Sequence, residues 1–142
     1  MKMKILLVDD EKDFVASLSQ RLQIRGLDVK TAFSGEEALD RIQQEEFDVV
    51  ILDVVMPGKD GIETLKEIKE IEPLLQVIML TGHATVETAI EGMKLGAYDY
   101  LMKPTETGAL IEKISNAHAL KKEHQERIRK AEINHIIKRR GW

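Results

Sequence analysis

The chain is organised around the stretch Val49-Val50-Ile51-Leu52-Asp53, which is followed by Val54-Val55-Met56-Pro57-Gly58. Four consecutive branched apolar residues favour a strand buried on both faces, and the Pro-Gly pair ends that strand. Asp53 therefore comes at the carboxyl end of a predicted central strand. Ligands bind at this edge of an open parallel sheet, so Asp53 is either an ordinary turn acid or part of a site.

The length of 142 residues allows one domain with its own core and a tail. The chain contains no cysteine, which excludes disulfides, thiolate metal sites and thiol redox switching. The apolar run near the start, residues 5–8, is too short for a signal peptide or a membrane span. We therefore expect a soluble, cytoplasmic protein without a membrane partner.

Charge divides the chain into two parts. Residues 1–120 contain 13 Lys and Arg against 22 Asp and Glu, whereas residues 121–142 contain 8 against 3. Nucleic-acid binding through a broad surface needs clustered Lys and Arg. We therefore expect no direct DNA contact by the acidic body.

Hydrophobic periodicity predicts five strands that alternate with five helices. The strands are short apolar runs at residues 4–8, 29–33, 49–52, 76–80 and 98–102. The helices have an apolar residue every third or fourth position, at residues 12–25, 35–45, 62–71, 86–95 and 106–120. Short connections between such units predict an α/β fold with right-handed crossovers: a doubly wound, five-stranded parallel sheet in a three-layer sandwich.

Two expectations concern how this core is filled. The fourth helix is predicted to turn one apolar face inward, formed by Val86, Ala89, Ile90 and Met93. Methionine adapts to irregular gaps in a core, so four methionines are interpreted as core filler: Met56, Met79, Met93 and Met102.

Polar residues follow four of the five strands: Asp9 and Asp10, Asp53, Thr81, and Lys103. Parallel strands end at the same edge, so three carboxylates, a hydroxyl and an ammonium should share one crevice. Two carboxylates about 4 Å apart repel by roughly 4 kcal/mol at an effective dielectric near 20, so the site needs a cation or protons. An all-oxygen site suits Mg²⁺, and the lack of Cys or His at these strand ends argues against zinc.

A carboxylate beside a divalent ion can attack a phosphoryl donor, because the metal and a lysine neutralise the charge on the phosphoryl oxygens. Asp53 stands alone at the tip of a central strand and is the expected nucleophile. Asp9 and Asp10 form an adjacent pair suited to holding the metal. Lys103 and Thr81 are expected to contact the phosphoryl oxygens.

With these residues the chain resembles the receiver domain of two-component response regulators over residues 3 to about 120. The resemblance implies a flavodoxin-like (βα)5 fold and phosphorylation of Asp53. It implies Mg²⁺ binding by Asp9, Asp10, Asp53 and the carbonyl of Val55. It also implies phosphoryl contacts by Thr81 and Lys103, a switch role for Thr81 and Tyr100, and a cis peptide bond between Lys103 and Pro104.

Within that family, three stretches are similar to receivers of enhancer-binding transcription activators, at residues 81–83, 87–90 and 95–100. The resemblance covers only the receiver part of those activators, and we expect no counterpart of their ATPase and DNA-binding domains within these 142 residues. We expect a phosphoacceptor signalling domain rather than a conventional enzyme, one that catalyses its own phosphorylation and slow dephosphorylation. A sensor histidine kinase or phosphotransfer protein would supply the phosphoryl group. The output face would combine residues 86–95, 98–102 and 106–120.

Two rival functions share the same residues. A phosphatase with an aspartyl nucleophile would use the acids, the threonine, the lysine and Mg²⁺, but it resembles a different order, with the nucleophile after the first strand and an added cap. An unphosphorylated interaction module should have lost part of this set of residues, and every member is present.

The basic tail, residues 121–142, allows three interpretations. A solvated helical extension agrees best with its interrupted heptads. A dimerising or linker coil is the second, and nonspecific nucleic-acid binding is the third. A homodimer could thus form through the C-terminal helix or through the expected output face.

Overall fold

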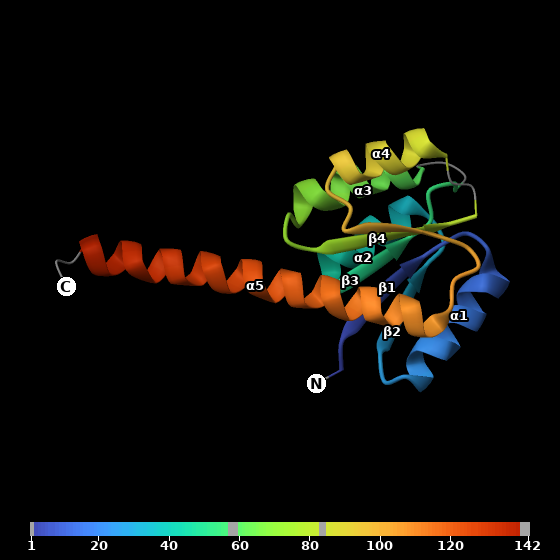
Figure 1. The fold of residues 1–142 in the computed structure, drawn as a ribbon, viewed down its shortest axis with the longest axis horizontal. Coiled ribbons are helices and arrows are strands. Elements are labelled where there is room, and N and C mark those ends of the chain that lie inside the picture. The colour runs from blue at the N-terminus through green and yellow to red at the C-terminus, as the bar shows by residue number, and fades with distance from the viewer. Residues whose placement is uncertain (1, 57–59, 83–84, 140–142) are drawn as a thin grey trace.

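The computed structural model describes residues 2–56, 60–82 and 85–139, in which strands and helices alternate along the chain. The elements are β1 (Lys4–Val8), α1 (Lys12–Ile24), β2 (Asp28–Ala32), α2 (Gly35–Gln44), β3 (Val49–Leu52), α3 (Gly61–Ile71), β4 (Gln76–Thr81), α4 (Val86–Lys94), β5 (Asp99–Met102) and α5 (Thr107–Arg139). The strands form one parallel sheet in the order β2-β1-β3-β4-β5 (Figure 1). The predicted doubly wound α/β fold is confirmed.

Helices cover both faces of the sheet, as the uninterrupted apolar strands require. Alternate residues of β1 and β3 pack into one core with α2 and α3, and the intervening residues pack into a second core with α1 and α5. All four residues of β3 are buried. Because helices pack on both of its faces, the sheet is the middle layer of a three-layer sandwich (Figure 1).

Helices α2 and α4 begin where the sequence supplies capping residues. The Ser34 side chain accepts a hydrogen bond from the backbone N–H of Glu37 at the start of α2. Thr85 and Thr88 form a reciprocal capping box at the start of α4. Such caps satisfy backbone donors that the first helical turn leaves unpaired.

The inward face predicted for α4 is wrong for its large residues. Val86, Ile90 and Met93 are 76%, 50% and 46% exposed, while Ala89 is partly buried. Gly92 is the buried residue of α4, and a Cβ there would overlap the sulfur of Met79. The helix approaches the sheet through its smallest residue, so its large apolar side chains remain outside.

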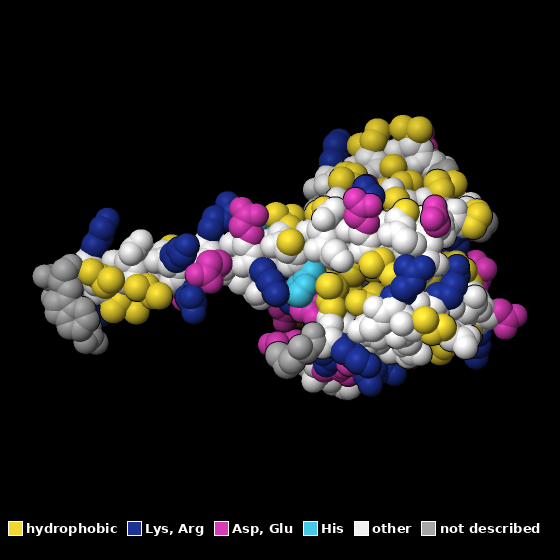
Figure 2. All heavy atoms as spheres, turned by 60° about the horizontal axis from the view of Figure 1, so that its bottom comes forward, with side chains coloured by type: hydrophobic (Ala, Val, Ile, Leu, Met, Phe, Trp, Pro, Cys, Tyr) yellow, Lys and Arg dark blue, Asp and Glu magenta, His cyan; other side chains and the backbone are white. Residues whose placement is uncertain are grey.

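The interpretation of methionines as core filler is therefore correct for two of the four. Met56 and Met79 are 5% and 0% exposed, whereas Met93 and Met102 are 46% and 50% exposed. Hydrophobic side chains gather over α4 at the top of Figure 2. The exposed pair thus belongs to the surface formed by α4 and β5 rather than to the core.

Helix α5 continues far beyond the sheet. Its buried residues, Leu110, Ile114 and Ala117, all lie in its first part, and the rest projects from the body (Figure 1). The Lys121 ammonium donates a hydrogen bond to the carbonyl of Phe47, 2.7 Å away, at the point of departure. In the described ranges no helix has both the length and the apolar character needed to cross a membrane.

Candidate functional site

Strand pairing brings the acidic residues together. β1 and β3 are neighbours, with Val8 opposite Leu52, so Asp9 and Asp53 leave adjacent strands at the same edge. Carboxylate oxygens of Asp9, Asp10 and Asp53 all lie within 4.8 Å of one another. Asp9 and Asp53 are only 1% and 2% exposed, and Asp10 is partly exposed. The cluster expected from the strand ends is present.

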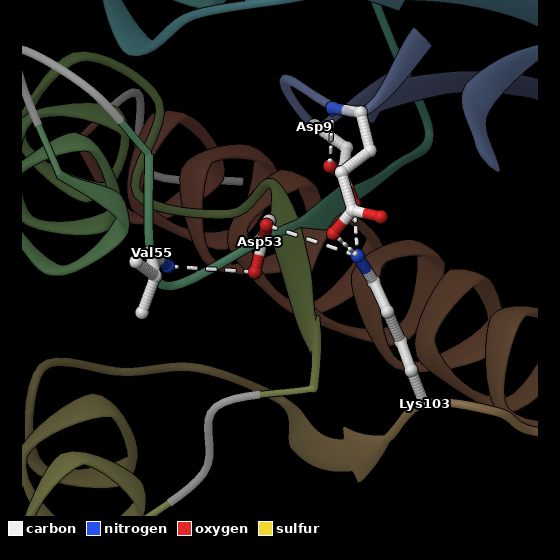
Figure 3. A network of polar contacts seen from close by, with 5 residues as sticks. Asp9, Asp53, Val55 and Lys103 are labelled. Atoms are coloured by element: carbon white, nitrogen blue, oxygen red, sulfur yellow. Dashed lines mark hydrogen bonds and ion pairs between the residues drawn. The ribbon is translucent and has the colours of Figure 1, made fainter. Parts of the chain in front are cut away.

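Lys103 reaches this cluster from the end of β5. Its Nζ lies 2.6 Å from Oδ2 of Asp9 and 3.8 Å from Oδ2 of Asp53 (Figure 3). Its side chain is 12% exposed, and the peptide bond from Lys103 to Pro104 is cis, as expected. One ammonium thus faces two nearly buried carboxylates directly.

The pKa values of Asp9 and Lys103 are both raised, but for different reasons. Burial raises the pKa of Asp9 above its ordinary value, and the neighbouring Asp53 adds to the rise; hydrogen bonds from Lys103 and from the backbone of Glu11 offset it only in part. Burial by itself lowers the pKa of Lys103, but the hydrogen bond to Asp9 and the surrounding carboxylates outweigh it, so the net pKa is raised. The ammonium therefore stays charged beside a destabilised carboxylate.

The segment after β3 orients Asp53. The backbone N–H of Val55 donates to Oδ1 of Asp53 over 3.4 Å (Figure 3). The N–H of Gly61, at the start of α3, donates to the carbonyl of Val54. A Cβ at Gly61 would overlap the carbonyl oxygen of Asp53, so only glycine allows this close approach. The role expected for the Val55 carbonyl stays a prediction.

Thr81 and Tyr100 lie on the two neighbouring strands beyond β3. Thr81 is the last residue of β4 and is fully buried, and its carbonyl accepts a hydrogen bond from the backbone N–H of Lys103 at 2.9 Å. Tyr100 packs against the core on the α3 and α4 side of the sheet. Its buried hydroxyl has no hydrogen-bond partner among residues 2–56, 60–82 and 85–139. An unpaired buried hydroxyl costs free energy, so no hydrogen bond from the described residues stabilises this position of the Tyr100 side chain.

Sequence reasoning missed two residues around the lysine. Glu11 Oε1 lies 3.3 Å from Nζ of Lys103, and the ring centroid of Phe14 lies 4.1 Å from the same atom. The apolar periodicity of residues 12–25 predicts for Phe14 only a place on the apolar face of that helix. The available signal was position, since Glu11 directly follows the acid pair and Phe14 comes in the first turn of α1.

The donor set fits a hard divalent cation. It consists of three clustered carboxylates, two of them nearly buried, and it offers oxygen ligands only. Mg²⁺ prefers oxygen ligands and binds through few carboxylates together with water and phosphate. Asp9, Asp10 and Asp53 are thus suited to holding Mg²⁺.

Comparison with known proteins agrees with this geometry. Residues 5–115 match the model of the response regulator receiver domain, and the chain belongs to this family of two-component signalling proteins. It is 42% identical over 118 residues to the transcriptional regulatory protein ZraR of Salmonella typhimurium. The aligned residues cover 83% of this chain and 27% of ZraR. The Escherichia coli K12 ZraR is 45% identical over 100 residues, 70% of this chain and 23% of that protein. The chain thus spans about a quarter of these curated relatives.

Solved structures give the same result. A CheY-like receiver domain protein from Methanospirillum hungatei superposes with a TM-score of 0.84 at 31% identity, covering 87% of this chain and 99% of the other. A receiver domain from Clostridium thermocellum gives 0.81 at 42% identity, covering 84% and 97%. NtrX from Brucella abortus gives 0.82 at 36% identity, covering 89% of this chain and 29% of NtrX. The predicted receiver fold and family are confirmed.

Proposed function

We propose that this chain is a cytoplasmic protein in which Asp53 accepts a phosphoryl group in a Mg²⁺-dependent reaction, with a sensor histidine kinase or phosphotransfer protein as donor. The observation that carries this proposal is the position of Asp53: a nearly buried carboxylate beside two further acids, with the Lys103 ammonium 3.8 Å away. In this proposal residues 1–120 form the receiver domain, and residues 121–142 form a basic extension of its last helix.

The chemical step is an in-line transfer. An oxygen of Asp53 attacks the phosphorus, the bond between phosphorus and the donor histidine nitrogen breaks, and its electron pair stays on that nitrogen. The N–H of Val55 at Oδ1 orients the carboxylate. Lys103 and the hydroxyl of Thr81 then donate hydrogen bonds to the phosphoryl oxygens. Attack by water on the same phosphorus later returns the carboxylate, so this phosphoacceptor catalyses its own phosphorylation and slow dephosphorylation.

Asp9, Asp10, Asp53 and the carbonyl of Val55 would hold the magnesium ion. Bound there, Mg²⁺ supplies positive charge that neutralises the carboxylates and the phosphoryl oxygens. The chain's own contribution is to keep the three carboxylates close together. Burial, with a smaller contribution from the neighbouring Asp53, raises the pKa of Asp9 there.

Phosphorylation would act as a switch. Thr81 and Lys103 move towards the phosphoryl group, and Tyr100 moves into the space beside Thr81. Two charge-assisted hydrogen bonds contribute about 1.5–3 kcal/mol each, against roughly 5.5 kcal/mol needed to turn a 1:99 balance into 99:1. The proposed switch is therefore a shift in preference between two states.

The surface formed by α4, β5 and the start of α5 is the proposed output face. It carries the exposed side chains of Val86, Ile90, Met93 and Met102, an unusual concentration for a surface in water. We propose that a homodimer forms through this face or through the projecting part of α5, where Ile128, Ile133 and Ile136 are about half exposed. The acidic body itself makes no direct DNA contact in this proposal.

The experiment combines the chain with Mg²⁺ and acetyl phosphate and follows its intact mass. We expect a gain of one phosphoryl group that survives acid and is lost in base. Asp53→Asn should prevent the gain, whereas Asp40→Asn, which removes an exposed carboxylate on α2, should leave it unchanged. Equal labelling of Asp53→Asn would refute the assignment, and rapid multiple turnover of phosphate esters would favour a phosphatase.

A further inference from the structure

Among the residues that the structure describes, four groups surround the Lys103 ammonium, and only two of these belong to the proposed phosphorylation chemistry. Asp9 and Asp53 are acids of the metal and phosphoryl site, 2.6 and 3.8 Å from Nζ. The other two are the Glu11 carboxylate, 3.3 Å away, and the Phe14 ring, whose centroid lies 4.1 Å away. Both come from the beginning of α1. We call the Glu11 carboxylate and the Phe14 ring the α1 seat.

Glu11 and Phe14 hold the Lys103 ammonium in a position that it must leave before it can contact a phosphoryl group on Asp53. Glu11 is nearer to Nζ than Asp53 is, so the ammonium is held towards α1. The face of an aromatic ring attracts a cation, and Phe14 also packs against the core beneath α1, which keeps its ring in place. Glu11 has a second link to the site, because its backbone N–H donates to Oδ1 of Asp9 at 2.9 Å.

We propose that Glu11, supported by Phe14, is a positioning residue that competes with the phosphoryl group for Lys103 and so weakens the phosphorylated state. The proposal rests on the function proposed for Asp53 and names a regulator of that same site. Glu11 touches neither the proposed metal position nor the phosphorus, and it acts through the lysine. A chain without this competitor should hold its phosphoryl group, or an analogue of it, more firmly.

The size of the effect follows from exposure. Glu11 is 58% exposed in its side chain, and ion pairs with one exposed partner are weak because water screens them. We therefore expect a change of about two- to fivefold in affinity, the range of exposed ion pairs. Glu11 makes no side-chain cap to α1, so its replacement leaves the start of the helix intact.

The test must distinguish the loss of the contact between Glu11 and Lys103 from the loss of one negative charge near the site. Glu11→Gln removes the charge and the ion pair, whereas Glu11→Asp keeps the charge but shortens the reach to Lys103. Asp13→Asn is the matched control, because Asp13 is an exposed acid in the same first turn and no described ion pair joins it to Lys103. The probe is beryllofluoride, a phosphoryl analogue, titrated at constant Mg²⁺ and followed by fluorine NMR.

A second readout measures, without any ligand, whether the Lys103 side chain lies over the Phe14 ring. The Lys103 methylene protons next to Nζ should show an upfield ring-current shift from Phe14 in the unsubstituted chain. This shift should diminish in Glu11→Gln and Glu11→Asp, disappear in Phe14→Leu, and persist in Asp13→Asn. It reports the position of the lysine and does not depend on phosphorylation.

The outcomes divide clearly. Tighter beryllofluoride binding by both Glu11 variants, with Asp13→Asn equal to the unsubstituted chain, supports the competition. If Glu11→Asp binds like the unsubstituted chain while Asp13→Asn binds like Glu11→Gln, only net charge matters and the proposal is overturned. Unchanged or weaker binding by Glu11→Gln also overturns it. If the unsubstituted chain binds no beryllofluoride, the function proposed for Asp53 fails, and this inference fails with it.

Discussion

The Lys103 ammonium lies 2.6 Å from Asp9 but 3.8 Å from Asp53, so it sits closer to the acid pair than to the proposed phosphoryl acceptor. Both carboxylates are nearly buried, and each depends on this cation for compensation while no metal is bound. The stability of the domain and the chemistry of its site are therefore linked through a single side chain.

Lys103→Met should destabilise the metal-free domain. Removing one partner of a buried ion pair leaves an uncompensated charge, at a cost of about 3 kcal/mol at neutral pH. Urea denaturation monitored by circular dichroism measures the change. Lys66→Met, which removes an exposed lysine on α3, is the control and should change the free energy of unfolding little. Equal effects of the two variants would contradict the linkage.

The same site predicts how stability depends on pH. The pKa of Asp9 is raised by burial, so between its ordinary value of 3.8 and this raised pKa the folded chain binds more protons than the unfolded chain. The contribution of Asp9 to the free energy of unfolding should therefore increase as pH falls through that window. In metal-free urea titrations between pH 7 and pH 4, Asp9→Asn should lack this contribution. A pH dependence identical to that of the unsubstituted chain would contradict it.

Mg²⁺ should raise the melting temperature. A ligand that binds only the folded state stabilises it by about 2.7 kcal/mol at a concentration of 100 times Kd. Asp10→Asn removes one of the three clustered carboxylates and should reduce the Mg²⁺-dependent shift strongly. Differential scanning calorimetry with and without Mg²⁺ provides the measurement. Asp40→Asn should keep the full shift, and a similar loss there would point to nonspecific screening.

Gly61→Ala should damage both stability and the site. The new methyl group would overlap the carbonyl oxygen of Asp53, so the backbone after β3 must shift. Overpacking of this kind costs about 1–3 kcal/mol. Chemical denaturation measures the loss, and Mg²⁺ affinity should fall in parallel because Asp53 moves. Gly82→Ala, where a Cβ meets no atom within 4 Å, is the matched control.

At high pH, Lys69 should make the free energy of unfolding depend on pH in the direction opposite to that expected for Asp9. Burial lowers its pKa below 10.5, so between the lowered value and 10.5 the unfolded chain binds more protons than the folded chain. Its contribution to stability should therefore rise with pH across that window. Lys69→Met should remove this rise, measured as the difference in urea midpoint from the unsubstituted chain between pH 7 and pH 10. Lys66→Met should preserve it.

The projecting part of α5 can be tested by truncation. A chain that ends after Lys122 keeps the hydrogen bond from Lys121 to Phe47 but loses the exposed isoleucines. If α5 forms the proposed dimer, light scattering should show a dimer for the full chain and a monomer for the shortened one. An unchanged mass would exclude this helix as the dimer contact and leave the output face as the candidate.

Much of the fold could be predicted from local patterns. A strand buried on both faces must be apolar at nearly every position, and β3 is apolar throughout. The helices instead have an apolar residue every third or fourth position. Because the two patterns differ, the order of strands and helices could be predicted from the sequence. The acidic cluster could be predicted too, because the ends of parallel strands share one edge and Asp9 and Asp53 each follow a strand directly.

The prediction for α4 was wrong because periodicity shows that a helix has an apolar face but not what that face contacts. Gly92 approaches Met79 so closely that the helix meets the sheet there, and Val86 and Ile90 face outward. An apolar face that contacts water in the isolated domain has the same sequence pattern as one in the core.

The sequence by itself thus determined the α/β order of this chain, the residues at the carboxyl edge of its sheet, and its membership of the receiver family. Only the tertiary structure decided which partners surround Lys103. The end of each strand follows from its local apolar pattern, and the parallel arrangement then brings those ends to one edge. The meeting of a lysine after β5 with Glu11 and Phe14 on α1 depends on the packing of elements about 90 residues apart.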